Sequence, residues 1–214
     1  MNKKVIFGFY SILAVFSLVC TVSAAQLTVG VKAGDWIQYQ VTTTGTPDPS
    51  HAVVAANMTV LSVQGTSINV NILSTMSNDT VISTNSTLNL QTGQLIDNFI
   101  IPAGLAKGDQ FYDATIRGNI TIADVSQGTY SGTLRTLVNA TSGSNNYVWD
   151  QTTGVDVEGF STGTGYTMHT LANATNIWQT QVPEFTTTTL IGSVTAVGAV
   201  AVVTVAVVLT RKRN

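Results

Sequence analysis

The sequence predicts an all-β protein, with a single antiparallel β domain flanked by an N-terminal signal peptide and a C-terminal transmembrane helix. Three observations support this prediction. Short runs of alternating apolar and polar residues occupy residues 26–179, turn signals separate them about every ten residues, and an uncharged apolar stretch stands near each end of the chain. The pattern leaves two architectures open, a β-sandwich and a curved half-barrel sheet.

The alternating runs locate the strands. In DWIQYQVTT and in INVNIL apolar residues alternate with polar ones, which is the pattern of a strand with one buried face. The motif QGTS between residues 58–63 and 68–73 predicts a hairpin turn. LAKGDQF is the best candidate for a short helical turn. Further strands are expected at residues 80–90, 94–101, 110–116, 120–125, 129–139, 147–150, 155–161 and 166–172.

The stretch NNYVWDQTTGVDV predicts a β-hairpin with a tight turn. The Asp150 side chain is expected to accept hydrogen bonds from the turn, and Gly154 is expected to take the left-handed backbone conformation. Trp149 is expected in or near the core, together with Trp36 and Tyr39 of the first alternating run. We interpret this hairpin as structural rather than as a binding site.

The N-terminal stretch has the pattern of a cleaved secretory signal peptide over residues 1–25. Two lysines precede an apolar run, and the run ends in the small residues Ser-Ala-Ala. Export of the following β domain, residues 26–179, is therefore expected.

The C-terminal stretch predicts a membrane anchor. Residues 190–210 carry no charge and, as a helix, are long enough to cross a hydrocarbon layer of about 30 Å. The tail 211–214 begins with Arg211, Lys212 and Arg213, and basic residues next to a span stay on the cytoplasmic side. The β domain is thus expected on the extracellular face of the cell membrane, joined to the span by a Pro/Thr stalk over residues 180–189.

Charge and cysteine content exclude several classes of function. Residues 26–189 hold eleven acidic and four basic residues, so their net charge of about −7 disfavours nucleic-acid binding. The single cysteine, Cys20, lies in the predicted signal peptide. The mature protein is therefore expected to have no disulfide, no thiol nucleophile and no cysteine-bound metal.

Candidate catalytic and metal-binding residues are few. Two histidines are too few for a histidine-built metal site, and no G-x-S-x-G nucleophile elbow occurs. We expect His51 in a solvated loop and His169 as a half-buried pair partner in a strand. The pattern therefore predicts no catalytic residues, no cofactor and no metal site.

Two pairs of acidic residues could in principle hold calcium, which prefers several oxygen ligands. They are Asp109 with Asp113 and Asp156 with Glu158. No known calcium-loop pattern surrounds them, so we interpret all four as solvated acids in turns.

Six N-x-[ST] triplets lie in the exported part, a modest excess over chance in a chain so rich in Ser and Thr. Combined with the export signal, they predict that several sites carry glycans. The candidates are Asn57, Asn78, Asn85, Asn119, Asn139 and Asn173.

Five segments together resemble a group of secreted, membrane-anchored archaeal surface proteins of unassigned function. They are VGVKAGDWIQYQV, FIIPAGLAKGDQFYD, GTYSGTLRTLVNAT, YVWDQTTGVDVEG and ATNIWQTQVPEF. In that group a V-G-D-W opening, an I-P-x-x-L-x-x-G-D middle and a Y-Y-W-D hairpin recur in this order. This chain departs at Val148, which replaces the second aromatic residue of the hairpin.

The C-terminal end is similar to a PEF-type sorting signal, with Pro183, Glu184 and Phe185 followed by an apolar span and a basic end. This resemblance implies an archaeosortase-like transpeptidase as a partner, which would cut near the motif and transfer the chain to a lipid. The tail is thus either a permanent anchor or a segment that is exchanged for one.

Together these features predict a cell-surface anchored glycoprotein, either an envelope module or a ligand-binding module without catalysis. Two alternatives remain, an extracytoplasmic enzyme acting on glycans and a lipid or ligand carrier of half-barrel type. The expected partners are the membrane, signal peptidase and the archaeosortase-like enzyme. A pocket lined by acids, an apolar cavity or a filled core would discriminate among these functions.

Overall fold

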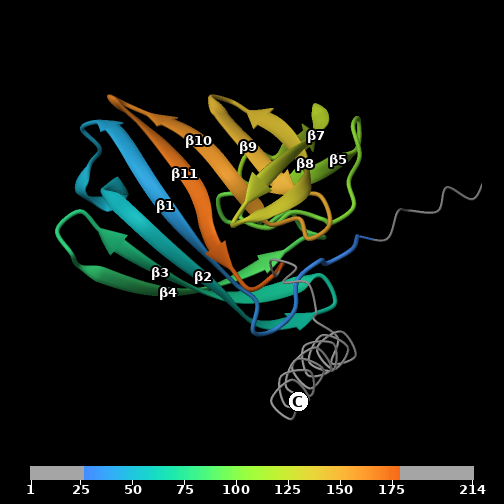
Figure 1. Cartoon of the computed structure of the whole chain (residues 1–214). Coiled ribbons are helices and arrows are strands. Elements are labelled where there is room, and N and C mark those ends of the chain that lie inside the picture. Colours follow the sequence, from blue (N-terminus) through green and yellow to red (C-terminus); the bar gives the residue numbers. More distant parts are fainter. Residues whose placement is uncertain (1–26, 179–214) are drawn as a thin grey trace, which may run out of the picture.

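The computed structural model describes residues 27–178, which form an all-β domain with a large antiparallel sheet (Figure 1). The predicted signal peptide, stalk, transmembrane span and basic tail lie outside the described residues. Within residues 27–178, no helix has the length and the apolar character needed to cross a membrane. The short 3-10 turn η1 spans Pro49–His51.

The strands come in three groups along the chain. The first group is β1 (Trp36–Gly45), β2 (Val53–Gln64), β3 (Ser67–Met76) and β4 (Val81–Asn89). A small hairpin follows, with β5 (Gln110–Asp113) and β6 (Gly118–Thr121). The last group is β7 (Asp124–Tyr130), β8 (Thr133–Ser142), β9 (Asn145–Asp150), β10 (Asp156–Gly163) and β11 (Tyr166–Thr175).

Nine strands form one continuous antiparallel sheet in the order β4-β3-β2-β1-β11-β10-β9-β8-β7. The strands β1 and β11, which are first and last in the described chain, are neighbours at its centre. β5 and β6 pair with each other in a separate two-stranded sheet. Figure 1 shows that the large sheet is strongly curved, and that the green segment carrying β5 lies beside its β7–β9 end.

The register sorts the side chains of this sheet onto an inner and an outer face, because paired residues share a face. Ile37, Met58 and Ile72 form one row on the inner face. The ring of Phe111 in β5 packs nearly perpendicular to the Trp149 ring at a centroid distance of 5.7 Å. The segment between β4 and β7 thus covers part of the inner face and closes a core there.

The three aromatic residues expected in or near the core differ in their positions. Tyr39 and Trp149 are fully buried, as predicted. Trp36 is half-buried and pairs with Thr59 on the outer face of the sheet, so its side chain lies outside the inner-face core.

The predicted tight turn between β9 and β10 is confirmed. The Asp150 carboxylate accepts hydrogen bonds from the backbone N–H of Thr153, at 2.9 Å, and from its hydroxyl, at 2.7 Å. Gly154 has a φ of +72°, and a Cβ at this position would lie 2.1 Å from the carbonyl oxygen of Ile101. Only glycine therefore fits this turn.

Two elements predicted from the sequence are wrong. Residues 94–101 form turns rather than a strand, since Ile96, Asp97 and Asn98 all have positive φ values. LAKGDQF contains no helical turn. Its Asp109 carboxylate instead accepts the backbone N–H of Ala106 at 2.7 Å, which closes a hydrogen-bonded turn.

Residues 129–139, predicted as one strand, belong to two. The chain reverses between β7 and β8 at Ser131 and Gly132, which have φ values of 47° and 76°. Residues 120–125 are likewise divided between β6 and β7. The QGTS hairpin turn between β2 and β3 is confirmed.

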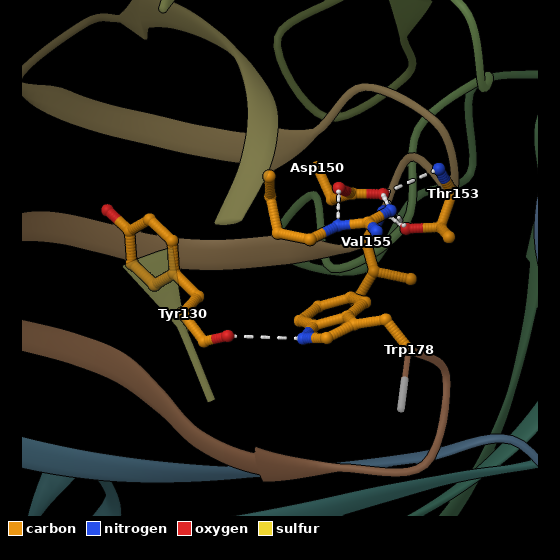
Figure 2. Close-up of polar contacts among 6 residues, drawn as sticks. Tyr130, Asp150, Thr153, Val155 and Trp178 are labelled. Carbon is orange, nitrogen blue, oxygen red and sulfur yellow. Dashed lines mark hydrogen bonds and ion pairs between the residues drawn. The ribbon is translucent and has the colours of Figure 1, made fainter. Parts of the chain in front are cut away.

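The last described residues pack against the β8–β9 hairpin (Figure 2). The indole N–H of Trp178 donates to the carbonyl oxygen of Tyr130 at 3.2 Å. The Arg135 guanidinium lies 5.1 Å from the centre of the Trp178 ring and donates two hydrogen bonds to Asp150, at 2.6 and 3.0 Å. The contacts among Trp178, Arg135 and Asp150 thus hold the end of the domain against the hairpin.

Candidate functional site

An open cleft lies on the inner face, at the end of the sheet where β1 ends and β11 begins. It consists of two adjoining hollows of about 300 and about 360 Å³. Both are lined by His51, Asp97, Phe99, Met168 and Thr170, so we treat them as one cleft. We call the first the acidic hollow and the second the apolar hollow. Their combined volume lies in the range of small-molecule binding sites.

The strand register builds the floor of the cleft. Val41, Thr170, Gly159 and Tyr147 form one row on the inner face across β1, β11, β10 and β9. Gly159 leaves an open space in this row, since a Cβ there would lie 3.6 Å from the nearest carboxylate oxygen of Asp156 and 4.0 Å from the Tyr147 ring. The absent side chain therefore makes room for the acidic hollow.

Asp156 lines the acidic hollow and is its most unusual group. The residue is 4% exposed, and its Oδ1 atom is buried without a hydrogen-bond partner. Burial raises the pKa of this carboxyl well above its ordinary value, and the nearby charge of Glu158 acts in the same direction. An unpaired buried carboxyl costs stability, and such costs concentrate at functional sites.

The strand irregularity at Asp156 explains its position. The pairing of β10 with β9 shifts register between Asp156 and Glu158. Because of this bulge, Asp156 lines the inner cleft beside Gly159, whereas Glu158 pairs with Val148 on the outer face. The expectation that both acids lie in solvated turns is therefore wrong, since Asp156 is buried and Glu158 is half-buried within β10.

Tyr147 forms the wall beside Asp156. Its ring stacks on Trp149 at a centroid distance of 5.3 Å, and its hydroxyl accepts a hydrogen bond from the Asn145 side chain at 3.2 Å. Burial raises the pKa of the Tyr147 phenol, and the charges of Asp97 and Asp156 also raise it. Both carboxyl groups therefore act on the same part of the cleft.

The opposite wall is a strained turn. Ile96, Asp97 and Asn98 have φ values of 47°, 53° and 59°. Residues other than glycine seldom adopt this backbone conformation, and it is least favourable for the β-branched isoleucine. The carbonyl oxygen of Asn98 accepts the indole N–H of Trp149 at 2.7 Å. The core thus holds the turn in place, and strain of this kind is typical of binding and catalytic sites.

The mouth of the cleft carries η1, where Asp48, Ser50 and His51 lie together. His51 Nδ1 is 2.9 Å from both Asp48 carboxylate oxygens and 3.1 Å from Ser50 Oγ, while Ser50 Oγ donates to Asp48. The hydrogen bond from Ser50, followed by that from His51, lowers the pKa of Asp48 to about 2. A nucleophilic triad needs serine on the ring nitrogen opposite the carboxylate, so this cluster does not form one.

The apolar hollow extends from the acidic hollow across β1, β2, β3 and β4. Its polar lining residues are five hydroxyl residues together with His51 and Asp97. Its apolar lining residues include Val41, Ala56, Ile72, Ile96 and Phe99. The ring of Phe99 also packs on Tyr39 at a centroid distance of 5.7 Å. This half of the cleft can therefore accept an apolar group.

The other residues singled out from the sequence lie apart from the cleft or at its rim. His169 is half-buried on the outer face, as predicted, with its Nε2 atom 2.7 Å from Glu158 and its ring stacked on Phe160. Asp109 is exposed in a turn, as predicted. Asp113 was expected to be solvated but is buried, and it accepts the side-chain N–H of Asn98 at 3.3 Å.

The strand register keeps the N-x-[ST] triplets off the floor of the cleft. In the large sheet, Asn57, Asn85 and Asn139 pair with outer-face residues. The exposed candidates are Asn78, Asn85, Asn119 and Asn173, and the partly buried ones are Asn57 and Asn139.

We expect glycan occupancy to follow this exposure, because the modifying enzyme must reach the amide. Glycopeptide mass spectrometry of protein from its native host should show higher occupancy at the four exposed sites than at Asn57 and Asn139. Higher occupancy at the two partly buried sites would contradict this prediction.

Comparison with known proteins yields no match, whether the chain is compared with family models, with curated proteins or with solved structures. In residues 27–178 no group of three or more His, Cys, Asp or Glu side chains is arranged to hold a metal ion. The function is therefore argued from the geometry of the cleft.

We expect Asp156→Asn to stabilise the protein. Because the pKa of Asp156 is raised in the folded state, the native protein holds the proton of this carboxyl more tightly than the unfolded chain does. The stability of the protein therefore falls as pH rises above about 4 and through the folded-state pKa. Asparagine keeps the size but cannot ionise, so the free energy of unfolding at pH 7 should rise by about 1–3 kcal/mol.

Urea unfolding of the full-length protein at a series of pH values measures this effect. The variant should lose less stability between pH 4 and pH 7 than the parent. Equal stability curves across this range would contradict the interpretation of Asp156 as a destabilising group.

Proposed function

We propose that this chain is a cell-surface anchored glycoprotein whose β domain binds a small extracellular ligand, without catalysis, in the cleft of a half-barrel sheet. The observation that carries the proposal is the buried Asp156 carboxyl, which lines the cleft with one oxygen unpaired. Buried polar groups are almost always satisfied, so an exception beside an open space implies a partner that is not part of the chain.

The shape of the sheet supports a binding role. A module that only fills space in a cell envelope needs no cleft, whereas here the core occupies one part of the inner face and leaves another part open. The strained turn at Ile96–Asn98 supports the same proposal, because backbone strain of this kind is typical of functional sites.

The register places the cleft far from the end of the domain. Trp36 and Thr175 lie at one end of the central strand pair, and Gly45 pairs with Tyr166 at the other. Ten residues of β11 separate the two ends, which corresponds to roughly 30 Å. If residues 190–210 anchor the chain in the membrane, the length of β11 separates the Gly45–Tyr166 end of the cleft from the end of the domain that leads to the anchor.

Three water-soluble aromatic probes of similar size and different charge test this function. They are 2-phenylethylammonium, 2-phenylethanol and phenylacetate, titrated by calorimetry into the full-length protein in nanodiscs, with empty nanodiscs subtracted. Gly159→Leu should fill the acidic hollow without backbone strain, since Gly159 does not have a positive φ. We expect at least one probe to bind the parent and to lose about tenfold or more in affinity in this variant.

Thr42→Leu is the matched control, because it adds the same side chain on the outer face of β1. It should bind like the parent. The binding function would be wrong if none of the three probes bound, or if Gly159→Leu and Thr42→Leu bound them equally well.

We also propose that an archaeosortase-like enzyme processes the tail at Pro183, Glu184 and Phe185 and that the product stays attached to the membrane. The support is the order of tripeptide, apolar span and basic end in the sequence. Intact-mass measurement of the mature protein from its native host should give a species that lacks Arg211, Lys212 and Arg213. A mature species that retains them would show that the tail is a simple transmembrane anchor.

A further inference from the structure

The two halves of the cleft differ in chemistry in a way that specifies the ligand. Asp97 and Asp156 line the acidic hollow together with the aromatic rings of Tyr147, Tyr166 and Phe99. No lysine or arginine of residues 27–178 lines either hollow. His51 also lines both hollows, but it contacts Asp48. The walls therefore offer negative charge and aromatic faces, and they offer no permanently charged cation to balance an anionic ligand.

We propose that the cleft binds an amphiphilic organic amine, with the Asp156 carboxylate as the counter-ion of its ammonium group and the apolar hollow holding its hydrocarbon part. This inference rests on the proposed binding function and names the chemical class of its ligand. An ammonium group donates hydrogen bonds to carboxylates and is attracted by aromatic faces, and both kinds of group are present here.

The position of Asp156 favours a cation over a neutral donor. Its Oδ1 atom is buried and lacks a partner within the described chain, and its Oδ2 atom lies beside the open space at Gly159, so a donor from the ligand can meet the carboxylate there. Burial and the charge of Glu158 raise the pKa of this carboxyl, and an ammonium group at contact distance would offset that shift by favouring the ionised form. A hydroxyl group could donate one hydrogen bond but could not balance the charge.

The apolar hollow explains why the amine should carry a hydrocarbon group. It adjoins the acidic hollow through Phe99, Met168 and Thr170, and aliphatic residues such as Val41 and Ile72 continue its walls. Burial of apolar surface contributes roughly 25 cal/mol per Å², so a hydrocarbon part lodged here adds affinity that a bare ammonium ion lacks.

The three probes of similar size separate this inference from the general binding function. We expect 2-phenylethylammonium to bind the parent at least tenfold more tightly than 2-phenylethanol, and phenylacetate to bind most weakly. Asp156→Asn should reduce the affinity for the ammonium probe at least tenfold and leave that for 2-phenylethanol within about twofold. Asp79→Asn removes the same charge from the exposed β3–β4 turn and should bind all three probes like the parent.

Each other outcome contradicts the assignment of the ligand as an amine. If 2-phenylethanol binds as tightly as the ammonium probe, or if Asp156→Asn affects both alike, the amine assignment is overturned and the binding function stands. If only phenylacetate binds, the assignment is overturned by the opposite charge preference. If none of the probes binds, both proposals fail. Circular dichroism and the melting temperature of Asp156→Asn verify that a loss of binding does not reflect unfolding.

Discussion

Replacing Trp149 with alanine is expected to lower the free energy of unfolding by about 3–5 kcal/mol, the usual cost of truncating a buried tryptophan. Trp149 is fully buried, its ring stacks on Tyr147, and the Phe111 ring packs nearly perpendicular to it. The substitution also removes the hydrogen bond to the Asn98 carbonyl oxygen, which holds the strained turn of the cleft. For a domain of this size, a loss of this magnitude lowers the melting temperature by roughly 10 °C.

Trp149→Phe separates the two contributions. Phenylalanine retains most of the apolar volume but has no N–H donor, so we expect a smaller loss, of about 1–3 kcal/mol. Thermal and urea unfolding of the full-length variants measure both values. If Trp149→Ala left the melting temperature unchanged, Trp149 would not be a core anchor.

The second large effect concerns Arg135. Its guanidinium forms a two-point ion pair with Asp150, whose side chain is fully buried. Replacing Arg135 with methionine leaves that carboxylate without its cation, and breaking one partner of a buried pair typically costs about 3–5 kcal/mol. Methionine keeps an apolar stem but removes the guanidinium that lies over the Trp178 ring, so the loss reports on the charge in both contacts.

A double variant tests this explanation. In Arg135→Met with Asp150→Asn the buried negative charge is removed as well, so part of the lost stability should return. If the double variant were as unstable as the sum of the two single variants, the ion pair would not be coupled, and packing against Trp178 would be the better explanation.

Turn chemistry made much of the fold predictable. Asp150 and Gly154 have side-chain and backbone properties that specify one tight turn, and the turn forms as expected. This turn depends on neighbouring residues only, which is why a single sequence is sufficient to predict it. The turns at Asp35 and Asp109 are also local, since each carboxylate accepts the backbone N–H three residues earlier, but at Asp109 the sequence was interpreted as a helical turn instead.

The candidate site was not predictable in the same way. Asp156 looked like an ordinary solvated acid, because its burial depends on a bulge in β10 and on the absence of a side chain at Gly159. The turn at Asp97 and Asn98 carried a local signal, since these residue types tolerate positive φ, but the apolar residues around it resembled a strand. Convergence of these segments on one cleft is a long-range property of the sheet.

The central position of β11 has a mechanical consequence. This strand leads to the end of the domain, and it is hydrogen-bonded to β1 on one side and to β10 on the other. A tension between a ligand held at the Tyr166 end and the chain beyond Trp178 would run along the strand. The backbone hydrogen bonds that join β11 to β1 and to β10 would then be loaded at the same time, in shear, instead of breaking one after another. If the domain is tethered and binds a ligand as proposed, this arrangement would let it resist a pull on the ligand without unfolding.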